Sequence, residues 1–322
     1  MLIDCVIQNP LNDELGSLLC SKVITMSREK VHFRVGTELR EYRIVGVVTA
    51  SNKSAVYKAY IKSLNLFVAL KVYTGFPVTQ IEKVAFLYSA HNISQLSHPN
   101  LVRLYKYGLR FEPFSFTHIY DNVEGIKPPV HLPLEETPET AYMAMEFVEG
   151  LLLSTLIPKK PTRDWIIQAA NYFLQLTSAV YYMHSCKFYD LFEKPQEGVF
   201  HGDISPDKIL ITHDGNTVKL LDFMRTVTRK EMPEGTPLSQ LANRATQKDD
   251  IRALGVTLYT MVIGNKPPFS ESEIRLSLKN ANIPYWMQSI IASLLTTEPS
   301  HQYDIVAEIH RDFHEHLKSD KD

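Results

Sequence analysis

Two acidic motifs lie close together in the second half of the chain and constrain its fold more than any other feature. Residues 201–210 read His-Gly-Asp-Ile-Ser-Pro-Asp-Lys-Ile-Leu, and residues 221–224 read Leu-Asp-Phe-Met. Each motif supplies one aspartate, Asp203 in the first and Asp222 in the second. A lone His-x-Asp is weak evidence, because short motifs recur by chance. The pair becomes informative only if matching elements occur elsewhere in the right order.

A lysine-bearing strand lies well upstream of these motifs. Residues 66–73, Leu-Phe-Val-Ala-Leu-Lys-Val-Tyr, form a β-branched and apolar run, which predicts a buried strand that carries Lys71. Residues 42–48 and 55–63 predict two more strands, and the polar residues 49–54 predict the turn between them. The first half of the chain is therefore expected to form a small β-rich unit.

Helices are predicted after this unit. A helical segment precedes His98, residues 144–150 predict a strand that leads into a connection, and Asp250 opens an apolar helix. Within residues 165–184 the apolar side chains recur at the spacing of one helical face. These side chains are Ile166, Ala169, Ala170, Phe173, Leu176 and Val180.

In this order the motifs resemble those of the eukaryotic-type protein kinases. That family has a catalytic loop His-Arg-Asp-Leu-x-x-x-x-Asn, a metal-binding Asp-Phe-Gly and a strand with Val-Ala-Ile-Lys. Residues 201–208, 222–224 and 68–71 stand in these three places. The resemblance covers residues 42–317. It implies an α+β fold of two lobes, a small antiparallel β-sheet lobe and a larger, mainly helical lobe.

The resemblance divides the chain into an N-terminal extension of residues 1–41, a small lobe of residues 42–150 and a large lobe of residues 151–322. Two segments are inserted relative to the compact family pattern, residues 111–140 and residues 188–198. We expect both to be surface loops. Because long loops are often functional, they are either solvated excursions or docking surfaces for protein partners.

By this resemblance the chain keeps three positions of the phosphate site. Lys71 would pair with the α- and β-phosphates of ATP, Asp203 would be the catalytic base, and Asp222 would bind magnesium. Alternatively, the three are salt-bridged structural residues. The resemblance also implies an adenine site and hinge at Val56, Ala69, Glu146, Val148 and Leu210. It further implies a stack of side chains that joins the lobes, called a spine, formed by Ile93, Leu104, His201 and Phe223. Asp250 would anchor the base of this spine.

Four positions near the phosphates depart from the family pattern. Lys208 replaces the metal-binding asparagine, Met224 the glycine of the tripeptide, Gly202 the arginine of the loop and, by spacing, Ser89 the glutamate that holds the lysine. An ammonium group repels a cation rather than binding it. Lys208 therefore either neutralises the phosphates directly, so that magnesium is weak or dispensable, or turns to solvent or pairs with Asp222.

Other departures lie further from the acidic motifs. The turn of residues 49–54 carries small polar residues where the family has glycines that let backbone amides approach the phosphates. Glu82 is the only carboxylate near Ser89 in its segment, and we expect it to be solvated. The family also has an ion pair between a glutamate and an arginine late in the large lobe. Residues 241–243 and Gln302 stand at these two places, so both partners are absent.

The composition is that of an ordinary globular chain. The 322 residues carry a formal net charge of −2, and 44% are hydrophobic, so there is no basic footprint for nucleic acid. Cys5, Cys20 and Cys186 lack the spacing of a metal site or disulfide scaffold. The N-terminus is polar, and no apolar run approaches the length of a membrane span. We expect a cytoplasmic protein, or a secreted effector that acts in a host cytosol.

These departures predict a pseudokinase, a kinase-fold protein with degraded catalytic motifs that binds ATP and acts as a scaffold or allosteric regulator. The alternative is an atypical active Ser/Thr protein kinase that transfers the γ-phosphate of ATP to protein, with Asp203 as base and Asp222 on one magnesium ion. Ser205 counts against it, because Ser/Thr kinases usually carry a lysine there. A third candidate is a phosphotransferase that acts on small molecules. The residues alone leave open whether the chain is an enzyme.

Overall fold

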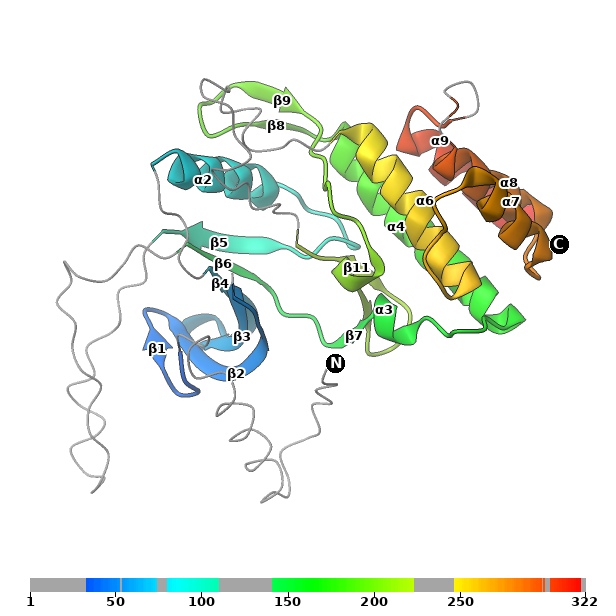
Figure 1. The fold of residues 1–322 in the computed structure, drawn as a ribbon. Coiled ribbons are helices and arrows are strands. Elements are labelled where there is room, and N and C mark those ends of the chain that lie inside the picture. The colour runs from blue at the N-terminus through cyan, green and yellow to red at the C-terminus, as the bar shows by residue number, and fades with distance from the viewer. Residues whose placement is uncertain are drawn as a thin grey trace, which may run out of the picture.

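The chain forms two lobes, a sheet-rich small lobe and a mainly helical large lobe (Figure 1). This arrangement confirms the predicted α+β class. The structure is a computed structural model, and it describes residues 33–52, 54–73, 80–109, 141–222, 246–296, 298 and 302–319. The inserted segment 111–140 lies outside these residues. None of the helices in the described stretches has both the length and the apolar character that crossing a bilayer requires.

The small lobe is built on a six-stranded antiparallel sheet in the order β1-β2-β3-β4-β6-β5. Alternate side chains of a strand point to opposite faces, so Tyr57 and Leu70 are buried with Tyr42, while Ala69 and Lys71 are only half-buried. The predicted strand 66–73 is confirmed. The six strands are β1 (Glu38–Leu39), β2 (Tyr42–Ala50), β3 (Ser54–Ile61), β4 (Leu66–Tyr73), β5 (Leu104–Gly108) and β6 (Tyr142–Glu146).

Helix α2 (Gln80–Ser94) lies against β5 (Figure 1). Phe86, Ala90 and Ile93 recur at helical spacing and are buried in the core that continues into the large lobe. Glu82 lies one turn before Phe86 on the same face and is only 7% exposed. The prediction that Glu82 is solvated is therefore wrong, because the helical repeat turns this residue inward.

The connection between the lobes needs a glycine. After β6 the chain runs into β7 (Gly150–Leu152), which pairs with β10 (Ile209–Thr212), and β10 pairs with β11 (Val218–Leu220). A Cβ on Gly150 would lie 2.1 Å from the Ile211 carbonyl oxygen. The close approach of these two strands therefore excludes any larger residue. Two short 3-10 helices also adjoin strands: Lys62–Leu64 follows β3, and Pro206–Lys208 precedes β10.

Helices pack around one core in the large lobe. The residues predicted to face inward from α4 are all buried, which confirms that helix. The Thr162 side chain caps α4 by accepting a hydrogen bond from the Trp165 amide, and Thr246 and Asp249 form a capping box at the start of α6. The helices are α3 (Leu153–Leu156), α4 (Arg163–Ser185), α6 (Gln247–Ile263), α7 (Glu271–Asn280), α8 (Tyr285–Leu295) and α9 (Val306–Ser319).

The inserted segment 188–198 was expected to be a surface loop, but it contains regular secondary structure. It forms most of a two-stranded hairpin of β8 (Lys187–Tyr189) and β9 (Pro195–Glu197). The Asp190 carboxylate accepts hydrogen bonds of 2.9 Å from the Phe192 and Lys194 amides, which fixes the turn. In Figure 1 the hairpin lies beside α2, on the side away from β5.

Candidate functional site

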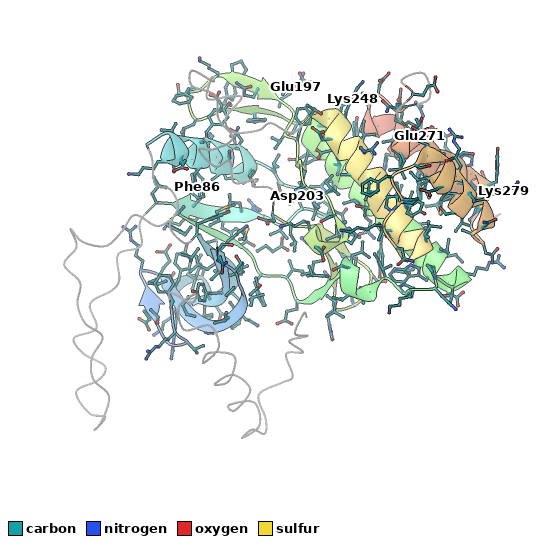
Figure 2. The ribbon with its side chains drawn as sticks, in the orientation of Figure 1. Phe86, Glu197, Asp203, Lys248, Glu271 and Lys279 are labelled. Carbon is teal, nitrogen blue, oxygen red and sulfur yellow. The ribbon has the colours of Figure 1, made fainter. Side chains whose placement is uncertain are left out.

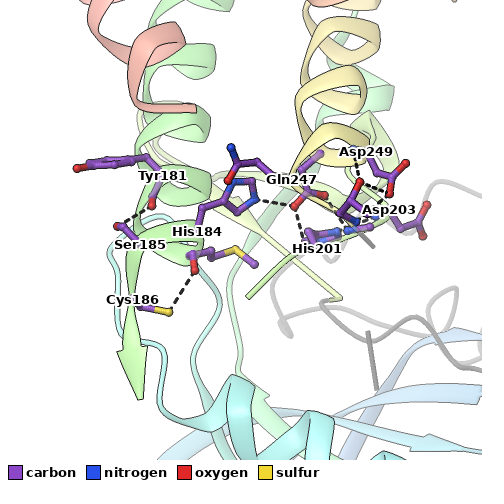
Figure 3. Close-up of polar contacts among 12 residues, drawn as sticks. Tyr181, His184, Ser185, Cys186, His201, Asp203, Gln247 and Asp249 are labelled. Carbon is purple, nitrogen blue, oxygen red and sulfur yellow. Dashed lines mark hydrogen bonds and ion pairs between the residues drawn. The ribbon is translucent and has the colours of Figure 1, made fainter. Parts of the chain in front are cut away.

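A buried carboxylate on α6 holds the loop that contains Asp203. Asp250 is 0% exposed and accepts hydrogen bonds from the His201 amide at 2.8 Å, the Gly202 amide at 2.7 Å and His184 Nε2 at 2.9 Å (Figure 3). Gly202 has a φ of 73°, a conformation that costs a glycine little and other residues more. The turn that presents Asp203 is thus fixed by one helix and one glycine.

The ring of His201, the first residue of the first acidic motif, is buried and contacts the second motif. Its Nδ1 accepts from the Asp203 amide at 3.2 Å, so the proton is on Nε2, which donates to the Leu221 carbonyl at 2.9 Å. Burial lowers the pKa of His201, although the bond to the Leu221 carbonyl opposes the shift. A neutral His201 therefore joins the loop of Asp203 to the residue just before Asp222.

Two lysines from different lobes converge on one aspartate. Lys71 Nζ donates to Asp222 Oδ1, and Lys208 Nζ donates to Asp222 Oδ2 at 2.5 Å. Lys208 Nζ also lies 3.9 Å from Asp203 Oδ2. Burial would raise the pKa of Asp222, but the charge of Lys71 and the bonds from both lysines hold it below its usual value. Lys208 is thus placed against Asp222 rather than in solvent.

The same cluster does not suit the two magnesium ions of the kinase pattern. Both oxygens of Asp222 accept lysine ammonium groups, and Lys208 would repel a cation. The Asp203 side chain is 60% exposed and lies where the lobes meet (Figure 2). In the part of the chain that the structure describes, no group of three or more His, Cys, Asp and Glu side chains is placed to hold a metal ion by itself. The donor set instead suits an anion such as a phosphate.

The predicted adenine positions come from three sheet segments. Val56 on β3 pairs with Lys71 on β4, Ala69 on β4 pairs with Met145 on β6, and Leu210 lies on β10. Val56, Ala69 and Leu210 are half-buried, whereas their neighbours Ala55 and Val68 are fully buried. These three apolar side chains therefore remain partly accessible at the faces of their strands.

Of the predicted hinge residues, Glu146 is the last residue of β6 and Val148 follows the strand, and both are half-buried. The Glu146 carboxylate accepts from Lys219 Nζ at 2.8 and 2.9 Å and from the Arg103 amide at 3.3 Å. With the Glu146 side chain so engaged, a ligand in the hinge would meet the backbone there. Lys219 was missed by sequence reasoning, because nothing local links it to a partner 73 residues away.

Several sequence predictions fall outside the described residues. Phe223 and Met224 of the second motif and residues 241–243 are among them. Gln302 is described, and its Nε2 donates to the Thr296 carbonyl. Of the predicted spine, Ile93 and Leu104 are buried in the hydrophobic core that joins the two lobes, and His201 is buried within the first acidic motif.

Comparisons with known proteins agree with this geometry. A model of the protein kinase domain matches residues 42–319. The serine/threonine-protein kinase PrkC of Bacillus subtilis is 26% identical over 309 residues, which cover 87% of this chain and 41% of PrkC. PknA of Mycobacterium tuberculosis is 26% identical over 265 residues, covering 78% of this chain and 53% of PknA. This chain therefore spans about half or less of these relatives.

Solved structures show the same fold. A crystal structure of the Mycobacterium tuberculosis PknI kinase domain, a double mutant, aligns with a TM-score of 0.60 at 17% identity and covers 89% of this chain and 100% of that one. The apo form of PpkA-294 aligns with a TM-score of 0.60 at 20% identity, covering 87% of this chain and 99% of that one. The chain therefore belongs to the eukaryotic-type protein kinase superfamily.

Proposed function

We propose that this chain is a nucleotide-binding pseudokinase that acts as a scaffold or allosteric regulator. One observation carries the proposal: Asp222, which stands where the family binds magnesium, has both oxygens occupied by the ammonium groups of Lys71 and Lys208. Phosphoryl transfer depends on positioning and on neutralising the γ-phosphate with metal ions. A site that replaces those ions with two lysines can hold phosphates but is poorly equipped for the transfer step.

ATP is the ligand that the family and the site favour, with magnesium weak or dispensable. Lys71 and Lys208 supply the positive charge that phosphate oxygens need. Val56, Ala69 and Leu210 offer partly accessible apolar surface for adenine. Glu146 and Val148 would contribute backbone groups.

An atypical active Ser/Thr protein kinase is the second candidate. It is favoured by the exposed Asp203 carboxylate, 60% accessible on a loop that Asp250 fixes, and by the Ser/Thr kinases among the relatives. In that case Asp203 would accept the proton of the substrate hydroxyl. Under either candidate, residues 111–140 and residues 188–198, most of which lie in the β8–β9 hairpin, are proposed contacts for protein partners. The exposed Tyr189 and Phe192 support the hairpin in this role.

Two paired measurements test the proposal. Thermal melting with ATP or ADP, in magnesium and in EDTA, should show stabilisation in both, because a ligand at about 100 times its Kd adds about 2.7 kcal/mol to the native state. Ala69→Phe should abolish the shift while the unliganded melting temperature stays near that of the natural protein. No shift at saturating nucleotide would overturn nucleotide binding.

Radiolabel transfer from ATP to the chain itself and to generic protein substrates separates the two candidates. We expect labelling far below the roughly 1–100 per second of typical kinases. Asp203→Ala is the control, because true activity depends on the base and contaminating activity does not. Strong labelling that disappears in Asp203→Ala would establish the second candidate.

A further inference from the structure

Helix α2 is held on two opposite faces. Phe86, Ala90 and Ile93 face the sheet and are buried. Tyr88 and His91 lie on the other side of the helix, Gln95 directly follows its last residue, and all three contact the β8–β9 hairpin of the large lobe. Figure 1 shows α2 between β5 and this hairpin. The position of α2 is therefore set by both lobes.

The contacts to the hairpin are specific hydrogen bonds. The Tyr88 hydroxyl donates to Asp190 Oδ2 at 3.1 Å. His91 Nε2 and Gln95 Nε2 both donate to the Tyr189 carbonyl, at 3.2 and 2.7 Å. The Tyr88 ring also packs on the Phe192 ring, with centroids 6.1 Å apart. One turn of the hairpin thus binds Tyr88 and His91 on one face of α2, and Gln95 directly after its last residue.

Asp190 organises this turn and is itself only 5% exposed. Besides Tyr88, it accepts from the Phe192 and Lys194 amides and from Gln196 Nε2 at 3.0 Å. Burial would raise the pKa of Asp190, but these hydrogen bonds outweigh it and lower the pKa. The carboxylate therefore stays charged and joins the turn to α2.

On its sheet side, α2 reaches Lys71 through two aromatic rings. The Phe86 ring meets the Tyr73 ring edge-on, with centroids 5.7 Å apart and an interplanar angle of 75°. The Lys71 ammonium lies 5.1 Å from the centroid of the Tyr73 ring, within the range of a cation–π contact. Lys71 and Tyr73 are two residues apart in β4, so both side chains lie on the same face of the strand.

We propose that α2 positions Lys71 through the Phe86–Tyr73 ring pair, and that the β8–β9 hairpin keeps α2 in place for this purpose. The family uses a glutamate of this helix to hold the lysine, and Ser89 stands there in this chain. A serine side chain is uncharged and cannot form that ion pair. Tyr73 and Phe86 are then positioning residues, and the hairpin replaces part of the constraint that the ion pair would give.

The test measures Lys71 directly in the nucleotide-free protein, so it does not depend on the proposed function. The full chain is treated with an amine-acylating N-hydroxysuccinimide ester, and the acylation rate of Lys71 is measured by mass spectrometry. The rate is normalised to Lys279, an exposed lysine at the far end of α7 (Figure 2). Because the ring contact restrains the ammonium, Tyr73→Leu should raise the relative rate about threefold or more. Tyr73→Phe keeps the ring and should leave the rate unchanged.

The hairpin is tested with a matched pair of aspartates. Asp190→Ala should raise the Lys71 rate, although Asp190 belongs to the other lobe. Asp214 holds the β10–β11 turn in a similar way, accepting from Thr212 Oγ1 at 2.5 Å and the Asn216 amide at 3.2 Å, so Asp214→Ala should not change the rate. Circular dichroism and thermal melting identify variants that do not fold, and Phe86→Leu replaces Tyr73→Leu if the latter is one of them.

Three results would overturn the proposal. These are an unchanged Lys71 rate in folded Tyr73→Leu or Phe86→Leu, an equal increase in Tyr73→Phe and Tyr73→Leu, and an Asp190→Ala rate no higher than that of Asp214→Ala. Nucleotide affinity is a second readout that rests on the proposed function. In Tyr73→Leu, ADP should bind more weakly and adenosine, which lacks phosphates, should bind as before. If the natural protein binds neither, the proposed function fails while the acylation test still stands.

Discussion

Replacing Lys208 by asparagine should make nucleotide binding depend on magnesium. The Lys208 ammonium lies 2.5 Å from Asp222 Oδ2 and 3.9 Å from Asp203 Oδ2. Magnesium lies roughly 2 Å from its carboxylate ligands, so an ion on either aspartate would lie within about 4–6 Å of this positive charge. The asparagine amide oxygen, by contrast, is a ligand that magnesium accepts.

The size of the effect follows from the charges. Two unit charges about 4 Å apart interact by about 4 kcal/mol at an effective dielectric constant of about 20, so a divalent ion would be repelled by about 8 kcal/mol. The Lys208 side chain is 28% exposed and can turn towards solvent, which relieves most of this repulsion. We therefore expect a remaining penalty of about 1.4–3 kcal/mol, which offsets the roughly ten- to hundredfold gain in affinity that magnesium coordination would otherwise give.

Isothermal titration of ADP in excess magnesium and in EDTA measures this penalty. The natural protein should bind ADP with a Kd that differs by less than about threefold between the two conditions. Lys208→Asn should bind about tenfold more tightly with magnesium than in EDTA. Lys208→Met removes the charge without adding a ligand, and so separates repulsion from coordination. A tenfold loss of affinity in EDTA for the natural protein would refute the reasoning.

Three further predictions concern stability, measured by urea unfolding. Asp250→Ala leaves the buried His201 amide and the half-buried Gly202 amide without their acceptor and should lower the free energy of unfolding by about 3–5 kcal/mol. Gly150→Ala would place a Cβ 2.1 Å from the Ile211 carbonyl oxygen, and should lower it by about 1–3 kcal/mol because the strands must separate. The pKa of Asp222 is lowered in the folded state, so its charge stabilises the fold above the unfolded pKa of about 3.9, and this contribution fades as the pH falls through the folded pKa. The stability difference between the natural protein and Asp222→Asn should therefore be constant at neutral pH and shrink below about pH 4. A difference that stays unchanged down to about pH 2 would contradict a lowered pKa for Asp222.

Elements with a regular repeat could be predicted from the sequence, because the repeat is written locally. The apolar run at residues 66–73, with the lysine within it, indicates a strand on its own, and β4 has the same limits. The inward residues of α4 follow from helical spacing alone. The family motifs then placed Lys71, Asp203, Lys208 and Asp222 in one site, and the structure brings them together.

Contacts between distant segments could not be predicted in this way. The bond from Lys219 to Glu146 joins two strands of different lobes, and a sequence pattern does not state which charged residues will meet. The hairpin at residues 187–197 depends on Asp190, whose partners include Tyr88 in another lobe. The charge of Glu82 favours exposure to solvent, but its place on the inward face of α2 buries it. In each case tertiary packing outweighs the local preference.

The charge balance of the proposed phosphate site bears on how nucleotide binding should work. Lys71 and Lys208 lie against Asp222, with Asp203 near Lys208, so two positive groups already meet two negative ones. Phosphate oxygens would have to replace Asp222 as acceptors of the lysine bonds. The free energy gained in such an exchange is only the difference between the lysine–phosphate and the lysine–aspartate ion pairs. The exchange also leaves the Asp222 carboxylate beside the phosphates with fewer partners. We therefore expect the adenine contacts to supply most of the affinity, and the lysine–aspartate ion pairs to join the two lobes when nucleotide is absent.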